Sequence, residues 1–294
     1  MTYSIVARDP DTGELGVAVQ SHWFSVGSIV TWARPGVGAV ATQANAEAAY
    51  GPDALTLLAD GVPAPEALEQ LVVGDPGGPS RQVAVIDAAG RIGVHTGPAC
   101  IAHAGHITGR DASCQANIMA SERVWPAMLK AFEAALGSLS SRLLDALDAA
   151  EREGGDLRGR QSAAILVVPA EGEPWRTVVS LRVEDHPDPL SELRRLVALQ
   201  GAYRLAGQAD ELLNAGREQE AGRLYVQASE RAPTNHELLF WAGLGTVAAG
   251  DFDRGVAMVR SAIELQPAWR ELLSRLPEDL APAAPDVLSG LGES

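Results

Sequence analysis

The chain has 294 residues, of which 46% are hydrophobic and 21% charged, a balance that excludes a mainly disordered protein. Its 23 Lys and Arg against 38 Asp and Glu give a net charge of −15 at pH 7, which argues against nucleic acid and membranes as partners. Two cysteines are too few for a disulfide framework, and no run reaches the roughly 20 apolar residues of a membrane span. The first residues also lack the basic and apolar regions of a signal peptide, so we expect a cytoplasmic protein.

The first hundred residues alternate between strand-like and helical patterns. Two β-rich runs flank the turn formers of residues 9–13, which predicts a hairpin. Strands are predicted at 3–8, 15–20, 37–43, 82–87 and 91–96, and helices at 54–60 and 66–73. This half of the predicted domain therefore consists of hairpins interrupted by one pair of helices.

The next ninety residues repeat the same order of elements. Strands are predicted near His106 and Ser113 and at 161–168 and 177–183, and helices at 121–136 and 139–153. Because hairpins rather than crossovers join the strands, the sheets are expected to be largely antiparallel, with helices in paired blocks. A layered α+β domain is predicted for residues 1–188, ending where the two prolines of 185–189 break a strand and begin a helix.

Residues 189–294 are predicted to be all helical and contain an internal repeat. Four residue pairs are spaced by 34: Gly216 and Gly250, Ala221 and Gly255, Ala228 and Ala262, and Pro233 and Pro267. This period is typical of tetratricopeptide repeats, which we place at about 202–235 and 236–269. Two repeats are fewer than a free-standing array needs, which favours a homo-oligomer or a protein partner bound through the repeats. The alternative is a plain pair of helical hairpins that covers the first domain or makes a dimer.

A candidate nucleophile lies at the start of the first strand. Removal of Met1 would leave Thr2 with a free α-amine whose pKa of about 7.7–8.0 suits it to accept the proton of the Thr2 hydroxyl. Many unrelated proteins also begin with Met and a small residue, so this pattern by itself is not specific. Ser4 is a second candidate, because residues two apart on a strand face the same way.

Several segments resemble a bacterial family of unknown function, DUF1028. They are residues 2–21, 104–106, 115–119, 156–164 and 185–193, in order, so that the resemblance covers about residues 1–195. The family is similar in fold to the N-terminal-nucleophile hydrolases, which implies a four-layer αββα sandwich and an amide-cleaving or acyl-transfer site at the end of the first strand. Proteasome-like members use a lysine to lower the amine pKa, but the single lysine here, Lys130, lies in a predicted amphipathic helix.

The family-like motifs and strand ends supply further candidates. Asn117 is predicted to donate an amide N–H to a developing oxyanion. Substrate-binding residues are predicted at Gln20, Ser21, Gln43, Arg81, Gln82, Asp156, Arg158 and Gln161. Arg158 suits a substrate carboxylate, which points to an anionic small molecule. The alternative is that these polar side chains only tie strand ends and helix caps together.

A run of cysteines and histidines offers a different hypothesis. Cys100, His103, His106 and Cys114 are four zinc-competent side chains within fifteen positions. Their spacing matches no common zinc module, and buried cysteine is common, so we predict no metal site. The sequence also has no phosphate loop, dinucleotide fingerprint, nucleophile elbow or H-E-x-x-H motif, so no cofactor is predicted.

Two functions remain open at this point. The favoured one is hydrolysis of a small amide or related C–N bond by a hydroxyl near the N-terminus. The alternative is a non-catalytic ligand-binding or scaffold protein that retains the fold and uses the helical repeats for assembly. Whether the chain is an enzyme depends on whether Thr2 or Ser4 faces a pocket.

Overall fold

The computed structural model describes residues 2–292. These residues form two compact units, one ending at Arg195 and the other beginning at Leu196. The division lies inside one long helix, α6 (Pro189–Asn214), a few residues after the break that the two prolines predict. The candidate site lies in the first unit, and each unit is described below by itself.

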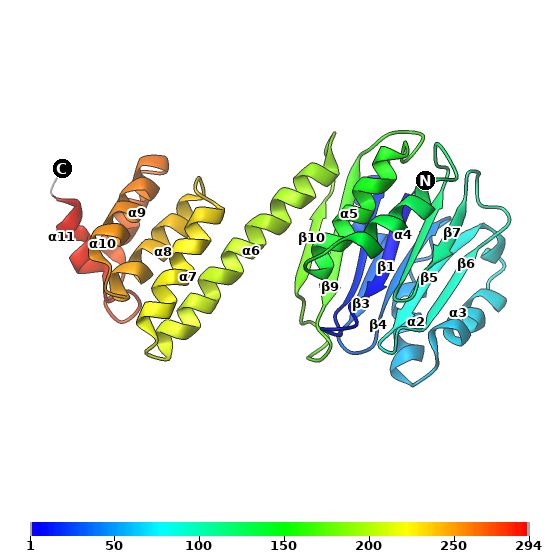
Figure 1. Cartoon of the computed structure of the whole chain (residues 1–294), viewed down its shortest axis with the longest axis horizontal. Coiled ribbons are helices and arrows are strands. Elements are labelled where there is room, and N and C mark those ends of the chain that lie inside the picture. Colours follow the sequence, from blue (N-terminus) through cyan, green and yellow to red (C-terminus); the bar gives the residue numbers. More distant parts are fainter. Residues whose placement is uncertain (1, 293–294) are drawn as a thin grey trace. The chain divides into compact units, whose positions relative to one another are not determined.

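The first unit contains two antiparallel sheets (Figure 1). The six-stranded sheet has the order β10 (Val179–Val183), β9 (Ser162–Val168), β2 (Leu15–Ser21), β1 (Thr2–Arg8), β8 (Ala112–Asn117) and β7 (Gly105–Thr108). The four-stranded sheet has the order β3 (Thr31–Arg34), β4 (Gly38–Ala44), β5 (Arg81–Asp87) and β6 (Ile92–Thr96). The hairpins β1–β2 and β5–β6 lie where the sequence predicts them.

Helices cover the outer face of each sheet. The pair α4 (Val124–Ala134) and α5 (Leu139–Arg152) packs on the six-stranded sheet, and α2 (Tyr50–Ala59) and α3 (Ala64–Val73) pack on the other. A short helix, α1 (Gly27–Val30), and a 3-10 turn, η1 (Gly78–Ser80), connect strands. The four-layer αββα arrangement that the resemblance predicts is therefore confirmed (Figure 1).

Strand β1 lies inside its sheet and is buried on both faces. Alternation along the strand points Val6 into the apolar core between the sheets, together with Thr2 and Ser4. Tyr3 points to the opposite face, where its hydroxyl donates a hydrogen bond to Glu151 of α5 at 2.6 Å. The beginning of β1 therefore places two hydroxyl side chains at one end of the inter-sheet core.

The second unit is helical, and its helix bounds repeat. Helix α7 spans Glu218–Arg231 and α9 spans Phe252–Leu265, so both ends are spaced by the predicted 34 residues. The other helices are α8 (His236–Ala248), α10 (Ala268–Arg275) and α11 (Ala284–Leu291). The spacing agrees with the predicted period, while membership of the tetratricopeptide family stays a prediction. No helix within residues 2–292 is long and apolar enough to cross a membrane.

The close approach of α8 and α9 leads to a test of the helical unit. A Cβ at Gly255 would lie 2.5 Å from the Gly243 carbonyl oxygen, whereas a Cβ at Gly207 of α6 meets no atom within 4 Å. We expect Gly255→Ala to lower the free energy of unfolding by about 1–3 kcal/mol, because the backbone of α8 must move. Gly207→Ala is the matched control and is expected to raise it by about 0.5–1 kcal/mol through helix propensity. Hydrogen exchange of the helix amides measures both, and a stabilising Gly255→Ala would contradict the packing.

Candidate active site

Thr2 and Ser21 face each other across the β1–β2 hairpin. The antiparallel register pairs the two residues, and their hydroxyl oxygens lie 3.1 Å apart, within hydrogen-bond distance. Within residues 2–292, no carboxylate, imidazole or amine bonds to the Thr2 hydroxyl. The side chain of Thr2 is 5% exposed and lines a cavity of about 250 Å³. Met1, whose removal would free the Thr2 α-amine, lies outside the described residues.

Ser4, the second candidate nucleophile, is closed off by two amides. Its hydroxyl donates to Gln43 Oε1 at 2.7 Å and accepts from Gln115 Nε2 at 2.6 Å. The residue is 0% exposed and lines neither of the cavities beside Thr2. Its hydrogen bonds therefore serve the packing of the two sheets, and Thr2 is the hydroxyl that a small molecule can reach.

Side-chain amides connect the two sheets below these hydroxyls. Gln82 on β5 is the centre, because its Oε1 accepts from Gln43 Nε2 at 2.7 Å and from Asn117 Nδ2 at 2.9 Å. Its own Nε2 donates to the Ala116 carbonyl at 2.9 Å and to the Thr96 hydroxyl at 3.0 Å. The network consists of neutral groups that satisfy one another, so it holds the strand ends at no cost in buried charge.

Asn117 is suited to the predicted role of hydrogen-bond donor. Its register partner on β1 is Thr2, and its Nδ2 lies 3.5 Å from the Thr2 carbonyl oxygen, a long and weak contact. Because Nδ2 carries two hydrogens and only the one toward Gln82 makes a short bond, the second is available. Asn117 also lines a second cavity, of about 310 Å³.

The two cavities meet at a strained piece of backbone. Ala44 and Asn45 line both of them. Ala44 directly follows Gln43 and has φ +67°, and Ile118 directly follows Asn117 and has φ +55°. Non-glycine residues adopt this left-handed conformation at a cost, and such strain gathers at functional sites. The strain supports placing the site at this end of the inter-sheet core.

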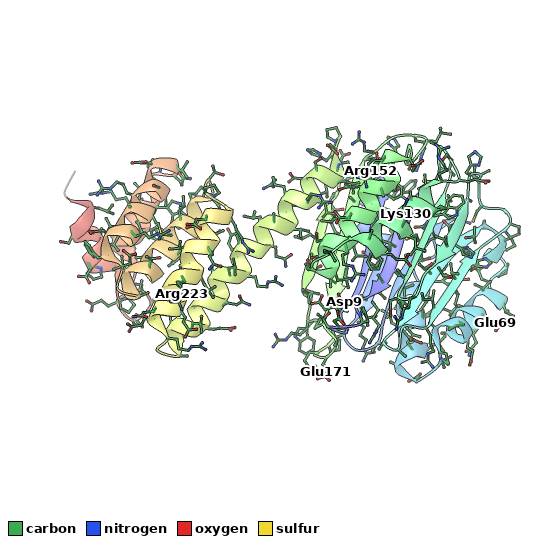
Figure 2. All side chains as sticks on the ribbon, viewed as in Figure 1. Asp9, Glu69, Lys130, Arg152, Glu171 and Arg223 are labelled. Atoms are coloured by element: carbon green, nitrogen blue, oxygen red, sulfur yellow. The ribbon has the colours of Figure 1, made fainter. Side chains whose placement is uncertain are left out.

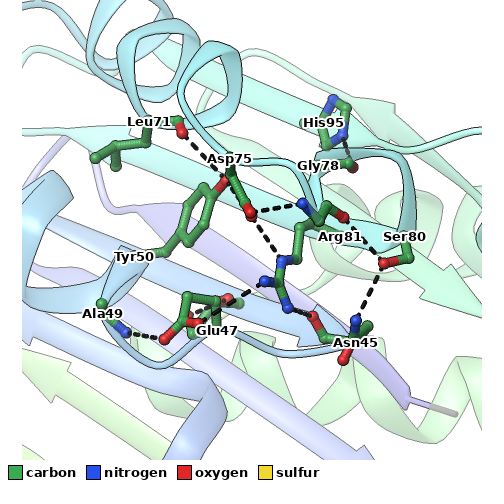
Figure 3. A network of polar contacts seen from close by, with 12 residues as sticks. Asn45, Glu47, Ala49, Tyr50, Leu71, Asp75, Gly78, Ser80, Arg81 and His95 are labelled. Carbon is green, nitrogen blue, oxygen red and sulfur yellow. Dashed lines mark hydrogen bonds and ion pairs between the residues drawn. The ribbon is translucent and has the colours of Figure 1, made fainter.

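Arg81, predicted to bind substrate, precedes Gln82 on β5, so alternation points its side chain to the opposite face of the strand. There it contacts Asp75 and Asn45 (Figure 3). Its Nε donates to Asp75 Oδ2 at 2.7 Å and its Nη1 to the Asn45 carbonyl at 2.5 Å. The Arg81 guanidinium lowers the pKa of the Asp75 carboxyl, and burial together with the Asp75 hydrogen bond raises the pKa of Tyr50 to about 12. Arg81 thus holds the backbone of Asn45, which lines both cavities, without lining either of them itself.

This ion pair predicts a pH-dependent stability. Because the folded pKa of Asp75 is below its ordinary value of 3.8, the pair stabilises the fold above pH 3.8 and ceases to do so as pH falls through the lowered pKa. We expect Arg81→Gln to lower the melting temperature most at neutral pH, with the difference from wild type shrinking below pH 3.8. Arg91→Gln is the control: its pair with Asp87 is also 2.7 Å long, but Arg91 is half exposed and should matter less at every pH. A difference independent of pH would contradict the assignment.

Asp156, Arg158 and Gln161 form a cluster beside the end of β2. Asp156 is buried and accepts hydrogen bonds from the His22 backbone N–H at 3.0 Å and from the Arg158 N–H at 2.9 Å. The Arg158 guanidinium also contacts the Asp156 carboxylate at 3.2 Å. Gln161 uses its backbone N–H to bond the Ser21 carbonyl. These residues therefore adjoin the end of β2 through Ser21 and His22 and line neither cavity.

Gln20 lies on the opposite face of the six-stranded sheet. It pairs with Tyr3, so alternation points its side chain toward the helices and away from Thr2. The residue is fully buried, and its amide nitrogen and oxygen have no hydrogen-bond partner within the described part of the chain. The structure does not bring Gln20 together with the other predicted site residues.

The remaining polar candidates are dispersed. Figure 2 shows Lys130 on α4, where it is exposed on the outer layer. His106 hydrogen-bonds Thr96, His103 lies near Glu122, and burial raises the pKa of both Cys100 and Cys114. Between residues 2 and 292 no three His, Cys, Asp or Glu side chains come together in a way that would hold a metal ion.

Four residues of the site were not among those predicted from the sequence. Gln115 and Thr96 complete the amide network. Trp23 and Asn45 line the cavity beside Thr2, and Asn45 also lines the second cavity. Gln115 had a detectable signal, because it precedes Asn117 by two strand positions and must face the same way. The others come from loops and a strand end, where no periodic pattern marks them.

Two antiparallel sheets between two pairs of helices, with a polar cluster at the start of the first strand, define a four-layer αββα protein. A family model described as "Family of unknown function (DUF1028)" matches residues 2–193, and the chain belongs to this family. The crystal structure of protein SPO2555 from Silicibacter pomeroyi, also DUF1028, is 33% identical, with a TM-score of 0.62, and the match covers 67% of this chain and 84% of that one.

A more distant likeness was found to Anbu (ancestral beta-subunit) from Yersinia bercovieri. It is 13% identical, covers 66% of this chain and 91% of that one, and has a TM-score of 0.32, too slight a likeness to inform on activity. No curated protein matches the chain. The comparisons therefore establish the family and leave the chemistry to be argued from the site.

Proposed function

We propose that this protein hydrolyses a small amide or related C–N bond with the Thr2 hydroxyl as nucleophile. The observation that carries the proposal is the difference between the two hydroxyls at the start of β1. Thr2 lines a cavity and bonds only another hydroxyl within the described residues, whereas Ser4 is closed off by Gln43 and Gln115. A reactive oxygen needs access to the substrate and freedom from competing strong bonds.

The proposed reaction needs removal of Met1, which exposes the α-amine of Thr2. The Thr2 Oγ1 forms a bond to the amide carbon while its proton passes to this amine, whose ordinary pKa is about 7.7–8.0. The C–N bond then breaks, the leaving nitrogen takes the proton, and the acyl group remains on Thr2 as an ester. Water attacks that ester, releasing the carboxylic acid and restoring the Thr2 hydroxyl. Each step is balanced and requires no cofactor.

Two groups support the negative charge and the proton in this scheme. Asn117 is paired with Thr2 across β1 and β8, and its second amide hydrogen is available to an oxyanion, a role worth about 2.7–4 kcal/mol where measured in other enzymes. The Ser21 hydroxyl, 3.1 Å from that of Thr2, can orient the nucleophile or carry its proton.

The test is the mass of the intact full-length protein before and after reaction with a β-lactone, which acylates reactive hydroxyls. We expect loss of Met1 and one adduct, mapped to Thr2. Ser4→Ala should retain that adduct and Thr2→Ala should lose it. Retained Met1 with no adduct would overturn the proposal, and an adduct on Ser4 would overturn the choice of nucleophile.

A groove in the helical unit favours a second candidate function, ligand binding or assembly through the repeats. It has a volume of about 410 Å³ and is lined by polar side chains such as Gln219, Arg223 and Gln227. If the repeats serve assembly, Gln227→Trp should fill this groove and reduce self-association in sedimentation experiments. Labelling of Thr2 should be unchanged by that substitution.

A further inference from the structure

The cavity beside Thr2 has an apolar wall. Trp23, Val26, Ile29 and Val30 line one side, all from the loop after β2 and from α1, and Thr2 lies at its edge. The wall is built into the fold, because the Ser162 hydroxyl donates to the Trp23 carbonyl at 2.5 Å and accepts from the Val26 N–H at 3.1 Å. The Trp23 side chain is 57% exposed, so it forms the rim and not the floor.

The described residues that line the two cavities at the site have no charged side chain, since none is Lys, Arg, Asp or Glu. Arg81 is engaged with Asp75 and the Asn45 carbonyl, and Arg158 contacts Asp156. A carboxylate entering the Trp23 cavity would lose its hydration without gaining an Arg or Lys side chain among the described residues, and the Thr2 amine acts in its uncharged form in the proposed reaction, so entry is costly. The net charge of −15 adds a general repulsion of anions.

We infer that this cavity binds an uncharged, apolar aliphatic or aromatic group on the acyl side of the substrate amide. Its volume of about 250 Å³ is below the roughly 300–1,000 Å³ of sites for drug-sized ligands, so it suits one such group and not a whole large ligand. The second cavity, which Asn117 lines, would then hold the amine side of the substrate amide. The inference departs from the anionic substrate that the arginines suggest in the sequence. It rests on the proposed function for the position of the scissile bond, but its test does not need turnover.

The test is binding of neutral primary amides to the full chain, measured by ligand-observed NMR. Affinity should rise roughly fourfold per methylene from acetamide through butanamide to hexanamide, because each methylene is buried. Adipamate, the same chain ending in a carboxylate, should bind at least about tenfold more weakly than hexanamide. Ile29→Trp fills the cavity from a half-buried position and should abolish the chain-length dependence. Leu136→Trp, at a position 91% exposed between α4 and α5 that does not line the cavity, is the matched control and should retain it.

The outcomes separate this inference from the proposed function. Equal binding of all chain lengths, equal binding of adipamate and hexanamide, or equal behaviour of Ile29→Trp and Leu136→Trp would overturn the inference. If Thr2→Ala binds hexanamide as wild type does while no hydrolysis is found with wild type, the cavity assignment stands and the hydrolase proposal fails. If the wild type hydrolyses amides with no preference for chain length, the hydrolase proposal stands and the cavity assignment fails.

Discussion

Thr2→Ala is expected to lower the rate of amide hydrolysis by at least about 10³-fold, because removal of a nucleophile leaves only binding and oxyanion stabilisation. Its free energy of unfolding should change little, since among the described residues the Thr2 hydroxyl makes one hydrogen bond, to Ser21. Ser4→Ala is the matched control and should lower the stability while leaving the rate of hydrolysis nearly unchanged. It leaves Gln43 Oε1 and Gln115 Nε2 without a partner among the described residues and should cost about 1–3 kcal/mol of stability, with a change in rate of less than about tenfold.

The measurement is steady-state hydrolysis of a neutral amide by the two variants, with urea unfolding of the same preparations. If the α-amine is the base, the wild-type rate should rise with pH and level off above about 7.7–8.0, because only the unprotonated amine accepts the proton. Thr2→Ser should keep part of the rate and the same pH profile. A Thr2→Ala rate within tenfold of wild type would exclude Thr2 as the nucleophile.

Gln82→Ala is expected to be the most destabilising change within the site, by about 3 kcal/mol. It removes the common acceptor of Gln43 and Asn117 and the donor to the Ala116 carbonyl, all buried, and it leaves a hole between the two sheets. Each orphaned buried group costs about 1–3 kcal/mol, partly offset here because Gln43 Nε2 also lies 3.3 Å from two backbone carbonyls.

The control for this change is Gln70→Ala, on the exposed face of α3, which should alter stability by no more than about 0.5 kcal/mol. Urea unfolding of both variants measures the difference. Because Asn117 loses its short bond to Gln82, labelling of Thr2 by the β-lactone should also slow in Gln82→Ala. Similar stability of the two variants would show that the amide network does not hold the sheets together.

The strand and helix pattern of the first unit was predictable because it depends on local periodicity. Alternating or continuous apolar runs ended by turn formers marked both hairpins, and apolar residues at helical spacing marked the two helix pairs. The short elements α1 and β3, four residues each, were missed because so few residues show no period. The 34-residue period likewise located the ends of α7 and α9.

The proximity of Thr2, Ser4 and Ser21 could also be predicted from the sequence. A hairpin with a short turn pairs the beginning of its first strand with the end of its second, and residues two apart on a strand face one way. Alternation also shows that the neighbours Gln20 and Ser21, or Arg81 and Gln82, cannot both face one cavity, although all four were predicted to line the site. We therefore expect at most one member of each pair to face the cavity between the sheets.

The sequence by itself determined the order of the elements, the two hairpins and the helical period. It also determined that the hydroxyls of Thr2 and Ser4 face the same way at the start of the first strand. Only the tertiary structure decided that Gln82 faces Gln43 and Asn117 while Arg81 turns to Asp75, and that Thr2 borders a cavity while Ser4 does not. The physical reason is that β2 is buried along its whole length and β5 nearly so. A strand with apolar residues on both faces carries no local signal of which face meets the second sheet, and that choice is made by contacts between residues far apart in the chain.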